Sequence, residues 1–224
     1  MWQNNAFGFL NPGWTFNVLN EKESDNFDEA LAFINDSHFS DADVAGVQKW
    51  RTPMKIKVEG DPSDKDLKAL NDIIDAFNSI DGFPGMQLVS SDENVRIIYT
   101  TKDNFERTRS QHIGNSVGGD KSFCRSSTRD GEIIQSIIVI EPDKPSQGYR
   151  NTVVLHEMFH AVGFYKHVPR RDSIMSEVGP VPGLSQTDTL ALKMLYNSDI
   201  PVGTSYSGFA NYYSNSTVRG FLNK

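Results

Sequence analysis

Two histidines and a glutamate stand at a spacing that can hold a catalytic metal ion. His156 and His160 are four positions apart, with Glu157 between them, in the pattern His-Glu-x-x-His. Residues four apart lie one above the other on a helix, so both imidazoles can bind one ion. Glu157 lies one position further round the helix and can reach a water molecule bound to that ion. The spacing therefore predicts a metal centre that activates water.

A third histidine, His167, follows shortly after this pattern. Three neutral imidazole nitrogens leave the fourth position of a tetrahedral Zn²⁺ site open for water, which is typical of catalytic rather than structural zinc. The sequence therefore predicts a zinc-dependent hydrolase. We expect Zn²⁺ as the cofactor, His156, His160 and His167 as its ligands, and Glu157 as the general base.

The residues around the motif predict a helix that is anchored in a core. Apolar side chains fall at positions i, i+3, i+4 and i+7, namely Leu155, Met158, Phe159 and Val162. This spacing gives a helix one buried stripe. The two histidines and the glutamate of the motif lie beside that stripe, not opposite it. We therefore expect them at the edge of the core, where a cleft can form.

A glycine and a methionine after the motif extend the pattern. Gly163 comes three residues after His160, where a helix needs a residue that tolerates positive φ in order to stop and turn. A turn at this point can bring His167 back towards the metal. A short apolar segment, Ser173-Ile174-Met175, follows.

These residues together resemble the metzincin clan of zinc peptidases. In that clan the second half of the motif reads His-x-x-Gly-x-x-His, and a methionine turn forms the floor under the zinc. The resemblance implies that His156, His160 and His167 are the ligands and that Glu157 is the general base. It also implies that Gly163 makes the turn and that Met175 forms the floor.

The chain departs from the clan at its third ligand. The clan places that ligand three residues after the glycine, where this chain has Lys166, and His167 comes one residue later. The interpretation therefore requires one extra residue in the turn, which loops accommodate readily. Glu177 and Asp172 are the rival third ligands, although Glu177 lies beyond the expected methionine floor.

A second departure concerns the residue that would stabilise the oxyanion. Some metzincins have a tyrosine two residues after the methionine of the turn, and this chain has Glu177 at that position. The oxyanion-stabilising residue therefore stays unassigned.

The order of expected elements predicts an α+β fold with an α/β-like upper half. It comprises a twisted mixed sheet, a backing helix, a zinc-site helix, a methionine turn and a C-terminal helix. In chain order we expect a helix over 27–34, a strand over 54–58, a helix from Ser63 to near Gly82, strands over 86–89 and 95–99, a long loop or weak strand over 107–131, a strand over 133–140, the zinc-site helix, the methionine segment and a helix from Ser185. The same order is found in metzincin catalytic domains.

Three regions follow from this order. We expect a zinc metallopeptidase domain over residues 50–203 and a C-terminal tail over 204–224. Residues 1–49 form an N-terminal extension that is either part of the fold or similar to an inhibitory pro-segment, and we favour solvated surface positions for its aspartates. The span from Trp50 to Gly203 also resembles an uncharacterised bacterial family of predicted metallopeptidases.

Composition excludes several classes of partner. The 224-residue chain has a net charge of −7 and no basic run, so we expect no nucleic-acid partner. No apolar stretch reaches the length of a membrane span. The N-terminus lacks the basic and apolar regions of a signal peptide, so we expect none in this chain. The metzincin resemblance implies a secreted or cell-envelope protein, and the oligomeric state stays open.

The remaining histidines and the cysteine lie outside any motif. Cys124 is the single cysteine, which excludes an internal disulfide framework, and we interpret it as a packed or unreactive thiol. His38 and His112 are solitary in sequence, and we interpret both as ordinary surface or loop histidines.

The leading functional hypothesis is a zinc endopeptidase that acts on protein or peptide. The alternative is a catalytically silent zinc-binding interaction module on a protease-like scaffold, which the shifted third histidine and the missing tyrosine would explain. A third possibility, the hydrolysis of a non-protein amide such as a cell-wall crosslink, requires the same chemistry.

Overall fold

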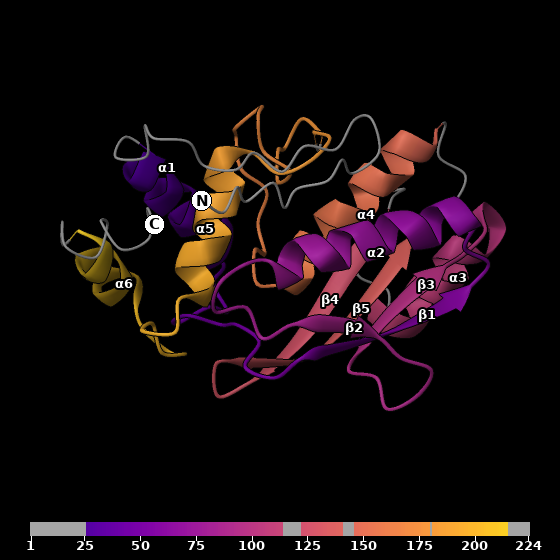
Figure 1. Cartoon of the computed structure of the whole chain (residues 1–224), viewed down its shortest axis with the longest axis horizontal. Helices are drawn as coiled ribbons and strands as arrows, with labels where there is room; N and C mark the ends of the chain where they lie inside the picture. The colour runs from indigo at the N-terminus through magenta and orange to yellow at the C-terminus, as the bar shows by residue number, and fades with distance from the viewer. Residues whose placement is uncertain (1–25, 114–121, 141–145, 180, 215–224) are drawn as a thin grey trace, which may run out of the picture.

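The computed structural model describes residues 26–113, 122–140, 146–179 and 181–214, and within them it forms an α+β fold. The described residues contain six α-helices, a short π-helix and a five-stranded mixed sheet. Figure 1 shows α2 and α4 above the sheet. Helices α1, α5 and α6 lie together at the left of the same view, beside the sheet. No helix in the described ranges is long and apolar enough to cross a bilayer.

The sheet has the strand order β2-β1-β3-β5-β4. Its members are β1 (Met54–Gly60), β2 (Met86–Leu88), β3 (Val95–Tyr99), β4 (Phe123–Arg129) and β5 (Glu132–Ile140). The first four strands in this order run parallel, and β4 pairs with β5 in the antiparallel sense. Because β4 is last in the strand order, it forms one edge of the sheet. Its first residues also border the cleft described below.

Successive side chains of a strand point to opposite faces of a sheet, and both faces of β3 are covered. Ile97 belongs to the main core beneath α2 (Asp64–Asn78) and α4 (Gln147–Ala161). Ile98 packs instead with Phe105, which comes from α3 (Lys102–Ile113). The helices α2 and α4 therefore cover one face, and α3 covers the other.

Two capping boxes fix the starts of helices that support the site. Ser63 and Asp66 form one at the start of α2, and Ser185 and Asp188 form the other at the start of α5 (Gln186–Tyr196). In each box the serine side chain accepts a bond from a backbone N–H, and the aspartate side chain accepts one in return. Both starts were predicted from the sequence.

Residues before β1 contribute to the same core as the sheet. Helix α1 (Asn26–Ile34) buries Phe27 and Phe33, and it continues into the π-helix η2 (Asn35–Phe39). At the other end of the chain, α6 (Tyr206–Tyr213) buries Phe209 and Tyr213 in that core. The segments on both sides of residues 50–203 therefore pack against the sheet-bearing region in the parts that the structure describes. A pro-segment role for the first 49 residues stays a prediction.

The prediction of a long loop or weak strand over 107–131 is wrong for its first part. Helix α3 extends to Ile113, and β4 then occupies Phe123–Arg129. Phe105 is the buried anchor of α3, and the helix after it is polar, so the apolar spacing that reveals an amphipathic helix is missing. Strand β4 is mostly polar after its first two residues. It lies at the edge of the sheet, where polar and charged residues are common, so the prediction of a weak strand is confirmed for this part.

Candidate metal centre

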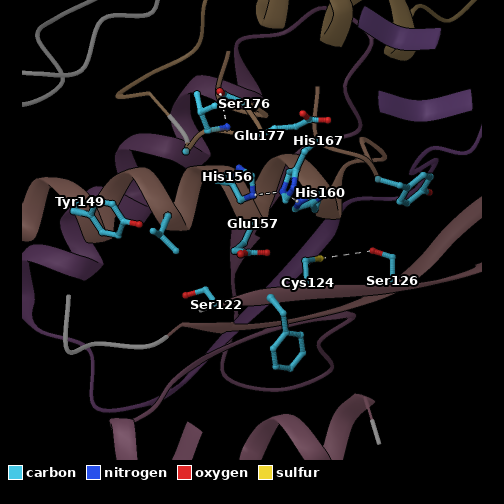
Figure 2. A pocket seen from close by; sticks show the side chains of 15 residues that line it. Ser122, Cys124, Ser126, Tyr149, His156, Glu157, His160, His167, Ser176 and Glu177 are labelled. Atoms are coloured by element: carbon cyan, nitrogen blue, oxygen red, sulfur yellow. Dashed lines mark hydrogen bonds between the residues drawn. The ribbon is translucent and has the colours of Figure 1, made fainter. Parts of the chain in front are cut away.

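Helix α4 carries the His-Glu-x-x-His motif in its last two turns. The helix starts at the N-cap Ser146, whose hydroxyl accepts a bond from the backbone N–H of Tyr149. Its second half is buried almost throughout. The helix packs against α2 and against strands β4 and β5, and its Phe159 ring lies beside that of Phe33 in α1. The motif therefore lies on a rigid element, with its polar side chains facing a cavity (Figure 2).

The three predicted histidines come together in space. Nε2 of His167 lies 3.1 Å from Nε2 of His156 and 3.3 Å from Nε2 of His160. Nitrogens bound tetrahedrally to one zinc at about 2.0–2.1 Å are about 3.3–3.4 Å apart. Within the described residues, these histidines form the group of possible ligands whose donor atoms lie close enough to hold one ion. The geometry fits a metal centre with three imidazole ligands.

Backbone carbonyls fix the tautomers of two of these rings. Nδ1 of His156 lies 2.6 Å from the carbonyl oxygen of Ile174, and Nδ1 of His160 lies 2.6 Å from that of Phe164. A carbonyl oxygen only accepts, so each Nδ1 carries the proton and each Nε2 presents a lone pair. The two lone pairs converge on one point, where a cation would remove their mutual repulsion.

Burial also keeps these rings neutral. It lowers the pKa of His156 to about 4 and the pKa of His160 well below the ordinary value of 6.5. Burial lowers the pKa of His167 as well, although the negative charge of Glu177 opposes that shift. Neutral imidazole is the form that binds a metal ion.

Glu157 is buried and lines the same cavity. Its Oε2 atom has no partner in the described part of the chain, and desolvation raises the pKa of the carboxyl group to about 8. A buried carboxyl oxygen without a partner is costly, so such atoms mark places where a ligand or water belongs. Figure 2 shows Glu157 between the histidines and the wall that carries Cys124. The orphaned oxygen fits a base that awaits a water molecule at a metal centre.

The methionine segment lies directly beside His156. Met175 is fully buried, and the preceding carbonyl of Ile174 accepts the proton of His156 Nδ1. Asp188 holds the segment in place, because its carboxylate accepts bonds from the Ser173 hydroxyl at 2.6 Å and from the Ile174 N–H at 3.0 Å. The capping aspartate of α5 is therefore connected to His156 through two hydrogen bonds, one from the Ile174 N–H to the aspartate and one from the imidazole to the Ile174 carbonyl. The role of Met175 as the floor stays a prediction.

Neither rival third ligand, Asp172 or Glu177, belongs to the group of donor atoms that can meet at one ion. Asp172 is exposed and forms an ion pair with Arg170 at 3.0 Å. Glu177 lies on the rim of the cavity, with an exposed side chain. Lys166, which stands where the metzincin pattern has its third ligand, points away to an ion pair with Asp41 at 3.1 Å.

Four consecutive carbonyl groups at the end of α4 accept bonds from side chains. The donors are Trp50 Nε1 to Ala161, Tyr196 hydroxyl to Val162, His38 Nδ1 to Gly163 and His160 Nδ1 to Phe164. The last carbonyls of a helix have no partner within the helix, and a buried end must find partners elsewhere. These four donors come from different parts of the chain and fix the point at which α4 ends.

The interpretation of His38 as a surface or loop histidine is wrong. Its side chain is fully buried, its Nδ1 lies 2.5 Å from the Gly163 carbonyl oxygen, and its Nε2 accepts a bond from the Gln48 N–H at 3.2 Å. The sequence gives no local signal for this position, because the contact with Gly163 spans 125 residues. His112 lies in α3, and its side chain is outside the described part of the structure.

The burial of His38 predicts a pH-dependent stability. Desolvation lowers its pKa from 6.5 to about 4, so the unfolded chain binds a proton between these values that the folded chain excludes. The stabilisation is complete above pH 6.5 and is lost as the pH falls towards 4, with a full size of about 3 kcal/mol.

Urea unfolding of metal-free protein at pH 7.5, 6, 5 and 4 measures this loss. Other buried histidines also contribute to the change of unfolding free energy with pH in the wild type. The His38→Asn variant keeps those contributions and lacks that of His38, so it serves as the reference. The wild type should lose more stability than the variant across this range, and equal losses would contradict the burial of a neutral ring.

The histidines open into a cleft of about 470 Å³. This is a typical size for a ligand site. One wall is the second half of α4, the opposite wall is the start of β4 with Cys124, and the rim includes residues 176–179 (Figure 2). Cys124 is partly buried, its Sγ lies 3.9 Å from Ser126 Oγ, and burial raises its thiol pKa. Cys124 packs against the main core, as predicted, and its lack of reactivity stays a prediction.

Comparison with known proteins identifies a family without assigning an activity. The model of a family described as "Protein of unknown function (DUF2927)" matches residues 20–213. The match includes the three histidines, Glu157, the cleft and the described elements from α1 to α6. No curated protein matches the chain. Because the match covers most of its length, this chain belongs to the DUF2927 family.

Proposed function

We propose that this protein is a zinc-dependent endopeptidase. The observation that carries the proposal is the convergence of three imidazoles, two of them with tautomers fixed by backbone carbonyls, beside a buried carboxyl group. One oxygen of that group, Oε2, has no partner among the described residues. Three neutral nitrogen ligands with an open fourth position favour catalytic zinc over structural zinc. A purely structural site would have no use for Glu157 beside that open position.

The roles of the residues follow from their positions. His156, His160 and His167 would hold Zn²⁺, which when bound supplies a Lewis acid and lowers the pKa of water to about 7. Glu157 takes a proton from the attacking water and passes it to the leaving amine. The carbonyls of Ile174 and Phe164 keep two imidazoles oriented, because each accepts the proton on the nitrogen that faces away from the metal. The buried walls around Glu157 limit the access of bulk water.

The position of β4 favours an extended polypeptide as the substrate. This strand borders the cleft and, among the described strands, pairs on one side only. An exposed edge strand can bind an extended peptide through backbone hydrogen bonds, with side chains alternating towards and away from the cleft. Such binding would place a peptide carbonyl beside the histidines. Metzincin membership is part of this proposal and rests on the motif, Gly163 and the methionine segment.

A mixed peptide library tests the substrate class. Zinc-loaded protein should cleave internal peptide bonds, which mass spectrometry detects as paired fragments with new termini. A parallel incubation with peptidoglycan crosslinks tests a non-protein amide. Cleavage of that amide alone would overturn the endopeptidase proposal and keep the hydrolytic mechanism. Zinc-loaded protein that cleaves neither substrate would favour a silent zinc-binding module.

A further inference from the structure

Residues 163–167 form the turn that ends at His167. This turn is hydrogen-bonded to residues 37–48, which precede the first strand of the sheet. His38 donates from Nδ1 to the carbonyl of Gly163 at 2.5 Å. The carbonyl of Ser37 accepts from the backbone N–H groups of Tyr165 at 2.7 Å and of Lys166 at 2.9 Å. Three residues of the turn are therefore bonded to two adjacent residues of η2.

Gln48 supports the turn from the other side. Its side-chain oxygen accepts a bond from the Tyr165 hydroxyl at 2.9 Å, and its backbone N–H donates to Nε2 of His38 at 3.2 Å. Gly163 has φ of +112°, and a Cβ added there would lie 2.9 Å from the Gln48 carbonyl oxygen. The close approach requires a glycine at this position. His38 and Gln48 thus brace each other as well as the turn.

The position of this turn affects two of the three histidines. The carbonyl of Phe164 accepts the proton of His160 Nδ1, and the end of the turn carries His167. A displacement of residues 163–165 would rotate His160 and shift His167 together. The turn also holds the extra residue that separates this chain from the metzincin spacing. The bonds from Ser37, His38 and Gln48 account for how a longer turn keeps His167 in place.

We propose that His38 and Gln48 are positioning residues for the metal centre, acting through the turn 163–167. The proposal rests on the proposed zinc site. His38 is fully buried, and its ring lies 5.6 Å from that of Tyr165 in a stacked arrangement. A ring required for packing alone would have no need of a donor at Gly163. The inference therefore depends on two side-chain bonds to the turn, from His38 Nδ1 to the Gly163 carbonyl and from the Tyr165 hydroxyl to Gln48.

Two amide substitutions separate the bonds made by the two ring nitrogens. The amide of asparagine reaches the position of Nδ1, so His38→Asn can keep the donor to Gly163 and loses the acceptor for Gln48. The amide of glutamine reaches the position of Nε2, so His38→Gln keeps the contact with Gln48 and loses the donor to Gly163. Both variants remove the ring and bury one amide, so their losses of folding stability should be similar.

Zinc affinity is the readout, measured by competition with a chromophoric chelator. His38→Gln should raise the dissociation constant about 10–100-fold, the range found for partners that orient metal ligands. His38→Asn should stay close to wild type. The visible spectrum of Co²⁺-substituted protein should change in His38→Gln and stay the same in His38→Asn. Urea unfolding of the metal-free variants measures their stabilities separately.

Equal zinc affinities and equal Co²⁺ spectra in the two His38 variants would overturn the role of Nδ1. If His38→Gln does not fold, Tyr165→Phe provides a second test. It removes only the hydroxyl that donates a hydrogen bond to the side-chain oxygen of Gln48. That variant should bind zinc more weakly than wild type, and unchanged affinity would overturn the proposal. Lys166→Met, which breaks an exposed ion pair from the same turn, is the matched control and should bind zinc normally. Wild-type protein that binds no zinc would contradict the proposed function itself.

Discussion

Replacement of Glu157 by glutamine should lower kcat for peptide hydrolysis about 10²–10⁴-fold, the usual contribution of a general acid–base group. Zinc content should stay at the wild-type level, because none of the three imidazoles is changed. Glutamine has nearly the same size and keeps an oxygen in the cavity, but it cannot take a proton from water. Assays of zinc-loaded protein on a single cleaved peptide, with metal content measured on the same samples, give both quantities.

A substitution on the opposite wall of the cleft provides the control. Cys124→Ala removes a side chain that lines the same cavity and has no proposed part in the chemistry. It should keep most of the wild-type activity. Wild-type rates from Glu157→Gln in protein that contains zinc would disprove the mechanism.

Replacement of His167 by alanine should remove most of the bound zinc, whereas Glu177→Gln should leave zinc binding intact. Nε2 of His167 lies 3.1 and 3.3 Å from the other two Nε2 atoms, within the spacing of ligands to one ion. Glu177 is exposed at the rim of the cleft and lies outside the group of atoms that can meet at one point. Equilibrium dialysis followed by elemental analysis measures zinc per chain in each variant.

The two variants also distinguish two classes of zinc site. Zinc retained in His167→Ala and lost in Glu177→Gln would identify a glutamate-ligand site, and the metzincin interpretation would fail. Asp172→Asn tests the remaining rival ligand and should bind zinc normally, because its carboxylate pairs with Arg170.

Most of the fold was predictable because its elements carry local signals. The strand β1 and the helices α1 and α2 follow apolar periodicity, and the boxes at Ser63 and Ser185 mark helix starts with a serine followed by an aspartate three residues later. Helix α3 was missed because its contribution to the core depends chiefly on Phe105, which leaves no repeating pattern.

The candidate metal centre was likewise predictable only where its residues carry a local signal. Its motif lies on one helix, so the sequence brings His156, Glu157 and His160 together through helical spacing alone. The supporting contacts are tertiary. His38 reaches Gly163 across 125 residues, and Trp50 reaches Ala161 across 111. A solitary histidine has the same appearance in sequence whether it is solvated or buried, so only the fold reveals its role.

Zinc titration of the metal-free protein, with peptide hydrolysis followed at each addition, tests the central claim most directly. The proposed site would hold one ion, and the proposed chemistry depends on that ion. We expect kcat/KM to rise in proportion to bound zinc and to level off at one zinc per chain. Hydrolysis that persists without metal, or its absence at one zinc per chain across a diverse peptide library, would contradict the account.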